Sequence, residues 1–317
     1  MVIQAPARSR AGRREGSPPA PRRRIQKAPF LLLAPAMVML VVFIGWPLVQ
    51  LVVMSFQKFG REQIFGAAPS FIGLDNYIAV LTDPAFWVVL GRSILLCVVC
   101  VAATMVLGVL IALLMTKLAA PMRVAVSIAL LLAWAMPALT ATIVWGWIFD
   151  TQYGLVNYFL SQVTGTDWTG HSWLIEPLSF FGVAAIIITW GAIPFVAFSV
   201  YAALTQVPDE VLEAAALDGA SGFKRFRLIV FPYLRSILVV LLILQIIWDL
   251  RVFAQIYALQ TIGGVRQDTN TIGVYIYSVS MASGDLGSGG AIAVILVILL
   301  LLISGYYIRS MLREDES

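Results

Sequence analysis

Six long apolar stretches dominate this chain of 317 residues. Each is long enough to supply the ~20 helical residues that cross the hydrocarbon core of a bilayer. They are, in chain order, Phe30–Phe56, Val89–Met115, Val124–Phe149, Leu178–Leu204, Leu228–Trp248 and Ala291–Ile308. The sequence therefore predicts an all-α integral membrane protein with six transmembrane helices.

Composition agrees with this class. Hydrophobic residues make up 60% of the chain and charged residues 12%, whereas about a quarter of a soluble domain is charged. The first apolar stretch follows basic residues and could be read as a cleaved signal peptide. It is longer than the ~7–15 residues of a signal-peptide core, so we expect an uncleaved span with a bend near Gly45-Trp46-Pro47.

The distribution of basic residues predicts the orientation. A net charge of +4 would suit nucleic acid, but 8 of the 21 Lys and Arg residues lie within the first 27 positions. With the N-terminus inside, 16 of the 21 face the cytoplasm, as the positive-inside rule requires. We expect a disordered cytoplasmic tail at 1–29, a transmembrane domain at 30–312 and a short cytoplasmic tail at 313–317.

The polar segment between the fourth and fifth stretches, residues 205–232, has a pattern of its own. It begins with acidic residues suited to a helix start, continues with three alanines that favour a helix and stops at a glycine. In order these are Asp209, Glu210, Glu213, Ala214, Ala215, Ala216, Asp218 and Gly219, after which Lys224, Arg225 and Arg227 lead into the fifth stretch.

The spacing of this segment resembles the EAA loop of permease subunits of bacterial ABC importers. The matching positions are Glu213, Ala214, Ala215, Gly219, Ile229 and Pro232, although Phe231 replaces the usual Leu. The resemblance implies a cytoplasmic coupling helix that docks on an ATPase; the plainer alternative is an ordinary connection between two spans. The coupling residues we expect are Glu210, Glu213, Ala214, Ala215, Ala216, Asp218, Gly219 and Phe223.

Three other segments are similar to permeases of the maltose and glycerol-phosphate group: residues 137–160, Trp190 with Pro194-Phe195, and Phe253–Tyr257 with Gly263-Gly264. The resemblance implies a permease subunit of a carbohydrate importer, with trehalose as one candidate solute, in the bacterial inner membrane. It implies a second permease subunit, expected to be a different chain, two ATP-binding subunits carrying ATP and Mg²⁺, and an external solute-binding protein or lipoprotein. It implies no cofactor in this chain itself.

The fifth stretch carries polar residues where a bilayer core disfavours them: Gln245, Trp248, Asp249, Arg251 and Gln255. Counted from Ser236 at ~1.5 Å per residue, Asp249 lies past the midplane of the membrane. Charges at such depth are costly and usually face a cavity or a partner. An aromatic plane beside hydrogen-bonding groups suits a sugar, and the resemblance adds Trp190 and Phe195 on the preceding span to this predicted substrate path.

Two alternatives for these residues stay open at this stage: a buried Asp–Arg pair that fixes packing, or side chains at the outer membrane interface. Asp249 and Arg251 point some 160° apart on a regular helix, so a direct pair would need distortion. A break in the helix is expected here, because transporter sites often use discontinuous spans.

Other functions find little support. No GxxxxGK motif provides a phosphate-binding loop, His171 is the only histidine, and no catalytic or metal-binding set is evident. Cys97 and Cys100 are expected to be buried thiols. We expect an outer interfacial belt from Trp145, Trp147, Phe149, Trp168 and Trp173. A secondary transporter or channel remains the alternative function, although its usual carboxylate relays and inverted repeats are missing.

Overall fold

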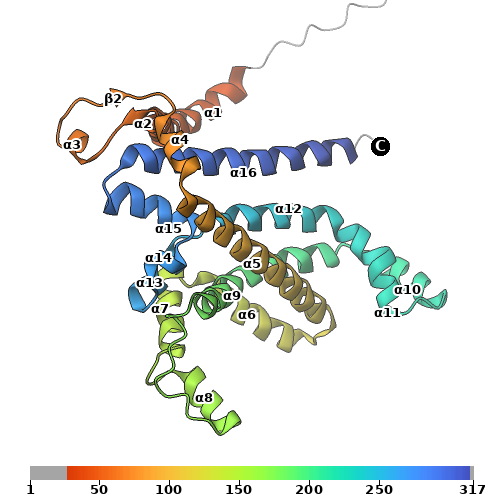
Figure 1. Ribbon diagram of the computed structural model, residues 1–317. Coiled ribbons are helices and arrows are strands. Elements are labelled where there is room, and N and C mark those ends of the chain that lie inside the picture. The colour runs from red at the N-terminus through yellow and green to blue at the C-terminus, as the bar shows by residue number, and fades with distance from the viewer. Residues whose placement is uncertain (1–26, 315–317) are drawn as a thin grey trace, which may run out of the picture. The chain divides into compact units, whose positions relative to one another are not determined.

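The computed structural model describes residues 27–314, which are mostly helical (Figure 1). Most of the two predicted tails lies outside this range, where their conformation stays a prediction. Residues 27–29, predicted to be disordered, are helical, so the N-terminal tail was predicted to extend too far. The chain divides into two compact units, Met1–Val49 and Gln50–Ser317.

The first apolar stretch is helical without a break. It consists of α1 (Lys27–Leu40), a π-helical turn (Val41–Gly45) and α2 (Trp46–Ser55). The π-helical turn ends at Gly45, where a bend was expected, and the segment Leu32–Ser55 is still one candidate span. A single widened turn therefore takes the place of the bend.

The remaining elements belong to the second unit. They are β1 (Gln57–Lys58), α3 (Arg61–Ile64), β2 (Ser70–Phe71), α4 (Asp75–Thr82), α5 (Pro84–Lys117), α6 (Ala120–Ala135), α7 (Ala138–Ile148), α8 (Leu155–Thr164), α9 (Pro177–Leu204), α10 (Asp209–Leu217), α11 (Gly222–Arg225), a π-helical turn (Phe226–Val230), α12 (Phe231–Leu250), α13 (Ala254–Ile262), α14 (Arg266–Thr269), α15 (Ile272–Tyr277), a second π-helical turn (Ser278–Ala282) and α16 (Leu286–Glu314). The two short strands pair antiparallel, Gln57 opposite Phe71.

Within residues 27–314, five helices are long and apolar enough to span a membrane, or six if α6 and α7 form one bent span. The prediction of six spans is confirmed when α6 and α7 are counted together as one bent span. The prediction of a continuous third span, Val124–Phe149, is wrong, because α6 and α7 meet at 104°. Pro137 is the reason: it has no N–H to donate, and it favours the extended conformation seen at Met136 (φ −74°, ψ 124°).

The fifth stretch is also interrupted. The helix continues past the predicted end at Trp248 to Leu250, and α13 resumes the helical path at Ala254. Residues 251–253 are not helical, so the helix is broken there, although Phe226–Ile262 still counts as one candidate membrane span. The later apolar piece Ile272–Ala282 is too short to span a membrane.

The core of the second unit lies where α9 packs against its neighbours. One apolar cluster joins Ala112 of α5, Val196 and Val200 of α9, and Leu234 and Leu241 of α12, all at most 1% exposed. A second cluster joins α9 to α7, α13 and α15. Helix α9 thus contacts both halves of the interrupted fifth stretch. Cys97 and Cys100 are buried free thiols on α5, as predicted.

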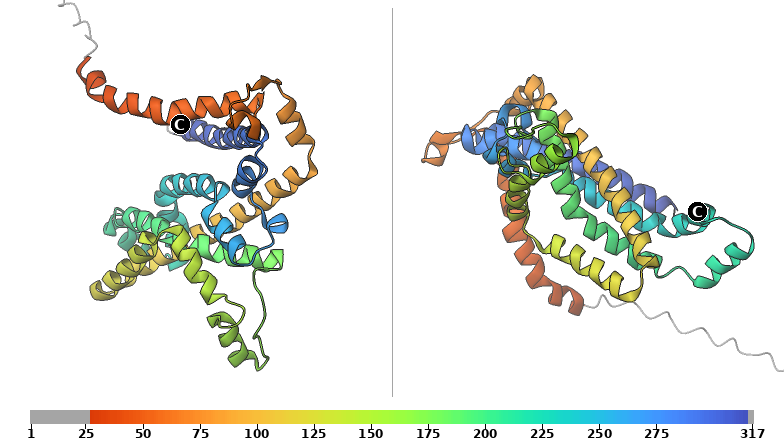
Figure 2. Two further views of the ribbon diagram at one scale, coloured as in Figure 1. Left: turned by 90° about the vertical axis from the view of Figure 1, so that its left-hand side faces the viewer. Right: turned by 90° about the horizontal axis from the view of Figure 1, so that it is seen from below.

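A compact loop around α8 protrudes from the helices of the second unit (Figure 2, left). Its centre is Asn157, which is 2% exposed. The Asn157 amide donates to the carbonyl oxygens of Thr151 (3.1 Å) and His171 (2.9 Å) and accepts from the Trp173 indole (2.6 Å). One buried side chain therefore ties both ends of the loop together.

We predict that Gly108→Ala loosens the contact between α5 and α9. A Cβ at Gly108 would lie 2.6 Å from a methyl carbon of Val196, which is fully buried. Overpacking of this kind costs about 1–3 kcal/mol, more than the gain of about 1 kcal/mol in helix propensity. Thermal unfolding of the purified protein should show a lower midpoint for this variant.

The matched control is Gly91→Ala on the same helix, where a Cβ meets no atom within 4 Å. It should unfold at or above the wild-type temperature. Equal midpoints for the two variants would contradict the close packing at Gly108.

Candidate functional site

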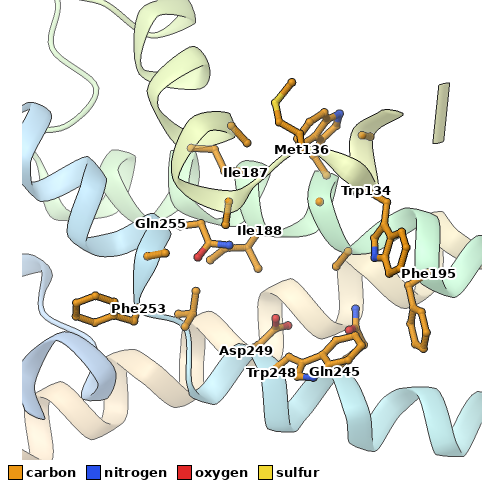
Figure 3. Close-up of a pocket in the computed structure, with 18 of the residues that line it drawn as sticks. Trp134, Met136, Ile187, Ile188, Phe195, Gln245, Trp248, Asp249, Phe253 and Gln255 are labelled. Atoms are coloured by element: carbon orange, nitrogen blue, oxygen red, sulfur yellow. The ribbon is translucent and has the colours of Figure 1, made fainter. Parts of the chain in front are cut away.

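A pocket of about 470 Å³ lies between α6, α7, α9, α12 and α13 (Figure 3). All seven residues predicted for the substrate path line it: Trp190, Phe195, Gln245, Trp248, Asp249, Arg251 and Gln255. The structure therefore brings together side chains from two spans that the sequence analysis had grouped. Their role toward a solute stays a prediction.

The polar centre of the pocket is formed by Gln245 and Asp249, one turn apart on α12. Gln245 is 0% exposed and Asp249 is 5% exposed. Both polar atoms of the Gln245 amide and Oδ2 of Asp249 have no hydrogen-bond partner in the described protein. Buried polar groups are nearly always paired, and these atoms lack a partner among the described residues although both side chains line the pocket.

The aromatic side of the pocket is built from Trp248 and Phe195, whose ring centres lie 5.1 Å apart in an edge-on arrangement. Trp248 is 42% exposed and presents its surface to the open pocket. Trp190 joins the wall from α9 and contacts Trp145 of α7 (5.9 Å). The pocket thus combines flat apolar surfaces with amide and carboxylate groups.

Arg251 occupies the break itself. It is the residue that ends α12, its side chain is exposed, and it lines the pocket. No ion pair joins it to Asp249 in the part of the chain that the structure describes. The alternative of a buried Asp–Arg packing pair is therefore not what the structure shows, in agreement with their angular separation on the helix.

The sequence analysis missed the opposite wall of the pocket. Trp134, Met136 and Ala138 border it at the junction of α6 and α7, next to the bend at Pro137. The available signal was the proline in the middle of an apolar stretch, since discontinuous membrane helices commonly line a cavity. Instead the sequence analysis treated the stretch as one continuous span.

The predicted interfacial belt forms a linked series of rings. Trp145 contacts Phe149 (6.2 Å), Phe149 contacts Trp173 (6.0 Å), and Trp173 stacks on Trp168 (6.0 Å). Trp147 stands apart, 70% exposed. Through Trp145 and Trp190 this series runs from the α8 loop to the pocket.

The predicted coupling segment has the local structure expected from its sequence. Helix α10 ends at Leu217, and Gly219 follows with a left-handed φ of +78°. The N–H of Ala220 donates to the carbonyl of Ala215 (3.0 Å), the bond typical of a glycine-terminated helix. The helix and stop are confirmed, whereas their role in coupling is not tested by geometry.

Most of the described side chains of this segment are open to solvent. Glu210, Glu213, Ala214 and Asp218 are exposed, and Leu217 is 90% exposed. The segment extends beyond the ends of α9 and α12 (Figure 1). The side chains of Ala216 and Phe223, both predicted coupling residues, lie outside what the structure describes.

Comparison with known proteins gives a consistent result. The family model described as "Binding-protein-dependent transport system inner membrane component" matches residues 104–314. The permease DasB of a diacetylchitobiose uptake system from Streptomyces coelicolor is 39% identical over 91% of this chain and 88% of its own length. The permease MalF of a trehalose/maltose transport system from Thermococcus litoralis is 32% identical over 89% of this chain and 93% of its own.

A solved structure shares the fold. A chain of a bacterial ABC transporter involved in the import of the acidic polysaccharide alginate superposes with a TM-score of 0.77, covering 90% of this chain and 95% of that one at 19% identity.

We predict that Gln245→Met raises the thermal stability of the protein. The substitution keeps the length of the side chain and removes a fully buried amide that has no hydrogen-bond partner among the described residues. Relief of one unsatisfied polar group is worth about 1–3 kcal/mol. The measurement is the unfolding midpoint of the purified protein in detergent.

Leu241→Met, one turn away and 1% exposed, serves as control and should give no increase. A lower midpoint for Gln245→Met than for wild type would show that the amide stabilises the fold after all.

Proposed function

This chain belongs to the family of inner-membrane components of binding-protein-dependent transport systems, and on that premise we propose that it is the membrane-spanning permease subunit of an ATP-driven carbohydrate importer. The observation that carries the proposal is the pocket between interrupted helices, with unpaired polar groups at its centre and aromatic rings on its wall. Irregular backbone at membrane depth is tolerated where it lines a cavity.

The solute we propose is a di- or oligosaccharide. A volume of about 470 Å³ falls in the range of ~300–1,000 Å³ typical of small-molecule sites. Trp248 supplies a surface for the apolar face of a sugar ring, while Gln245, Asp249 and Gln255 supply partners for hydroxyl groups. The printed names of relatives include diacetylchitobiose and trehalose/maltose, and trehalose itself remains one candidate among such glycosides.

The assembly we propose contains a second permease subunit of a different sequence and two ATP-binding subunits that hold ATP and Mg²⁺. An external solute-binding protein or lipoprotein delivers the sugar. One solved relative is an alginate transporter in complex with a periplasmic protein bound to an alginate pentasaccharide, with a TM-score of 0.76. ATP hydrolysis is assigned to the partner subunits, and the N-terminus of this chain to the cytoplasm.

The mechanism we propose is alternating access, with α12 as the connecting element. The basic segment after α10 continues without interruption through the π-helical turn at Phe226–Val230 into α12. The 20 residues of α12 reach about 30 Å at ~1.5 Å per residue, ending at the pocket. A displacement of the coupling segment by an ATPase would therefore move Gln245, Trp248 and Asp249 directly.

The alternative function is a secondary transporter or channel that works without an ATPase. Purification of the tagged chain from its native membrane distinguishes the two. An importer permease should bring an ATP-hydrolysing subunit with it, and the recovery of the chain with no ATPase activity would favour the alternative.

We predict that Arg251→Ala abolishes or strongly weakens sugar uptake without loss of assembly or basal ATPase activity. The Arg251 guanidinium borders the pocket. It forms no ion pair in the described protein, so the substitution breaks none. Trp248→Ala should weaken uptake through loss of one stacking surface. Uptake of radiolabelled disaccharides by cells expressing equal amounts of each variant is the measurement.

Trp147→Ala, an exposed tryptophan that does not line the pocket, should transport normally. If Arg251→Ala prevents assembly, the residue has a packing role instead. Normal transport by both pocket variants would place the substrate path elsewhere.

A second prediction concerns coupling. Gly219→Val should impair uptake, because a β-branched residue resists the left-handed conformation at φ +78°. Glu213→Lys should reduce ATPase association or its stimulation by solute, since it reverses an exposed charge on α10. Uptake and solute-stimulated ATP hydrolysis are compared at equal protein levels.

The matched control is Gly222→Val, three residues further along. Like Gly219 it has open space around its Cβ position, but its φ lies outside the left-handed region. Gly222→Val should retain most activity, and wild-type uptake by both Gly219→Val and Glu213→Lys would contradict a coupling role.

A further inference from the structure

A second polar hollow lies away from the sugar pocket, where α5 ends, α6 begins and α9 ends. Its volume is about 370 Å³, and its polar lining consists of Thr116, Arg123, Tyr201 and Thr205. Apolar side chains, among them Leu113 and Val230, form the rest of the wall. It touches Val207 before the coupling helix and Val230 after it.

Arg123 is the charged group of this hollow, and its partners are all neutral. One guanidinium nitrogen, Nη1, donates to the hydroxyl of Tyr201 (2.9 Å), and Nη2 donates to the carbonyl of Leu118 at a long 3.4 Å. Nε is shielded from solvent and has no acceptor in the described protein. A guanidinium stays protonated and carries five donors, so among the described side chains this half-buried cation has neither a counter-charge nor a full set of hydrogen bonds.

Two more basic side chains lie next to it. An adjoining hollow of about 300 Å³ shares Leu113 and Val230 with the first and is bordered by Lys117 of α5 and Arg225 of α11. Among the described residues that line the two hollows, none is acidic. Membrane topology alone explains basic residues at this end of the helices; Lys117 and Arg225 line the adjoining hollow, whereas Arg123 lines the first.

Tyr201 completes a binding arrangement. Its hydroxyl oxygen accepts from Arg123, which leaves its own proton free to donate into the same space. A guanidinium fork and a phenol beside it suit the oxygens of a phosphate group. The neighbouring apolar wall suits acyl chains, and basic pockets between membrane helices on the cytoplasmic side commonly hold anionic lipid headgroups.

We propose that this hollow binds a phosphate group, from an anionic phospholipid of the inner leaflet or from a soluble phosphate compound, between α5, α6 and α9. The assignment to the inner leaflet rests on the orientation given under the proposed function. Because the hollow touches both ends of the segment that carries the coupling helix, an occupant would restrain that segment relative to α5 and α6.

The test measures lipid retention. The full chain, with the subunits that co-purify with it, is exchanged into detergent containing phosphatidylglycerol or phosphatidylcholine, and bound lipid is counted by native mass spectrometry. Wild type should retain phosphatidylglycerol in preference to phosphatidylcholine. Arg123→Gln should lower that retention by about tenfold or more, the effect expected for loss of a charge-assisted hydrogen bond.

Two further variants keep the test decisive if Arg123→Gln folds poorly. Tyr201→Phe preserves the ring and removes the donor, so it should also lower retention, and Arg123→Lys should fall between wild type and Arg123→Gln. Lys224→Gln is the control, since Lys224 is exposed and lines neither hollow; it should retain lipid as wild type does.

Excess inorganic phosphate and glycerol 1-phosphate distinguish the sources. If bound lipid is displaced by neither soluble compound, the phospholipid is the occupant. If a soluble compound displaces the lipid and stays bound, that compound is the occupant. Either result supports the phosphate site. Equal retention by wild type, Arg123→Gln and Tyr201→Phe, with either lipid, would overturn it. Because no transport is measured, the outcome is independent of whether the chain carries sugar.

Discussion

Backbone hydrogen bonding is the constraint on which the rest of this structure depends. In hydrocarbon no water is available to a free N–H or C=O group, so a span can be interrupted only where protein or a water-accessible cavity takes over. The described chain has two such interruptions within its long apolar stretches, at Met136-Pro137 and at residues 251–253. Both border the same pocket. The non-helical backbone, which is costly in lipid, therefore lies at the cavity that we propose binds the solute.

The second interruption is supported by close packing as well as by the pocket. A Cβ at Gly273 of α15 would lie 2.8 Å from the carbonyl oxygen of Val252. Only a residue without a side chain allows α15 to approach the non-helical backbone so closely. The break between α12 and α13 is thus held by its surroundings, as a fixed corner of the pocket.

Much of this architecture could be predicted from the sequence, because apolar length and charge asymmetry act locally. The spans, the glycine stop after α10 and the polar set around Asp249 all follow from residues close together in the chain. The angle between α6 and α7 could not be predicted in this way. Pro137 indicates that a helix is disturbed, but whether it kinks slightly or turns by 104° depends on the helices packed around it.

The same limit applies to side chains that meet from distant parts of the chain. Nothing near Arg123 in the sequence indicates that the hydroxyl of Tyr201 lies 2.9 Å from its guanidinium. This contact comes from the folded arrangement of α6 against α9.

The series of aromatic rings between the α8 loop and the pocket has a consequence for observing this molecule. Trp168 and Trp173 lie with their planes only 6° apart at 6.0 Å, and Trp145 and Trp190 follow at the other end of the series. Indoles this close exchange excitation energy, so ultraviolet emission is shared within the Trp168–Trp173 pair and within the Trp145–Trp190 pair. Emission of the second pair can therefore report on a rearrangement around Trp190 without any label attached to the protein.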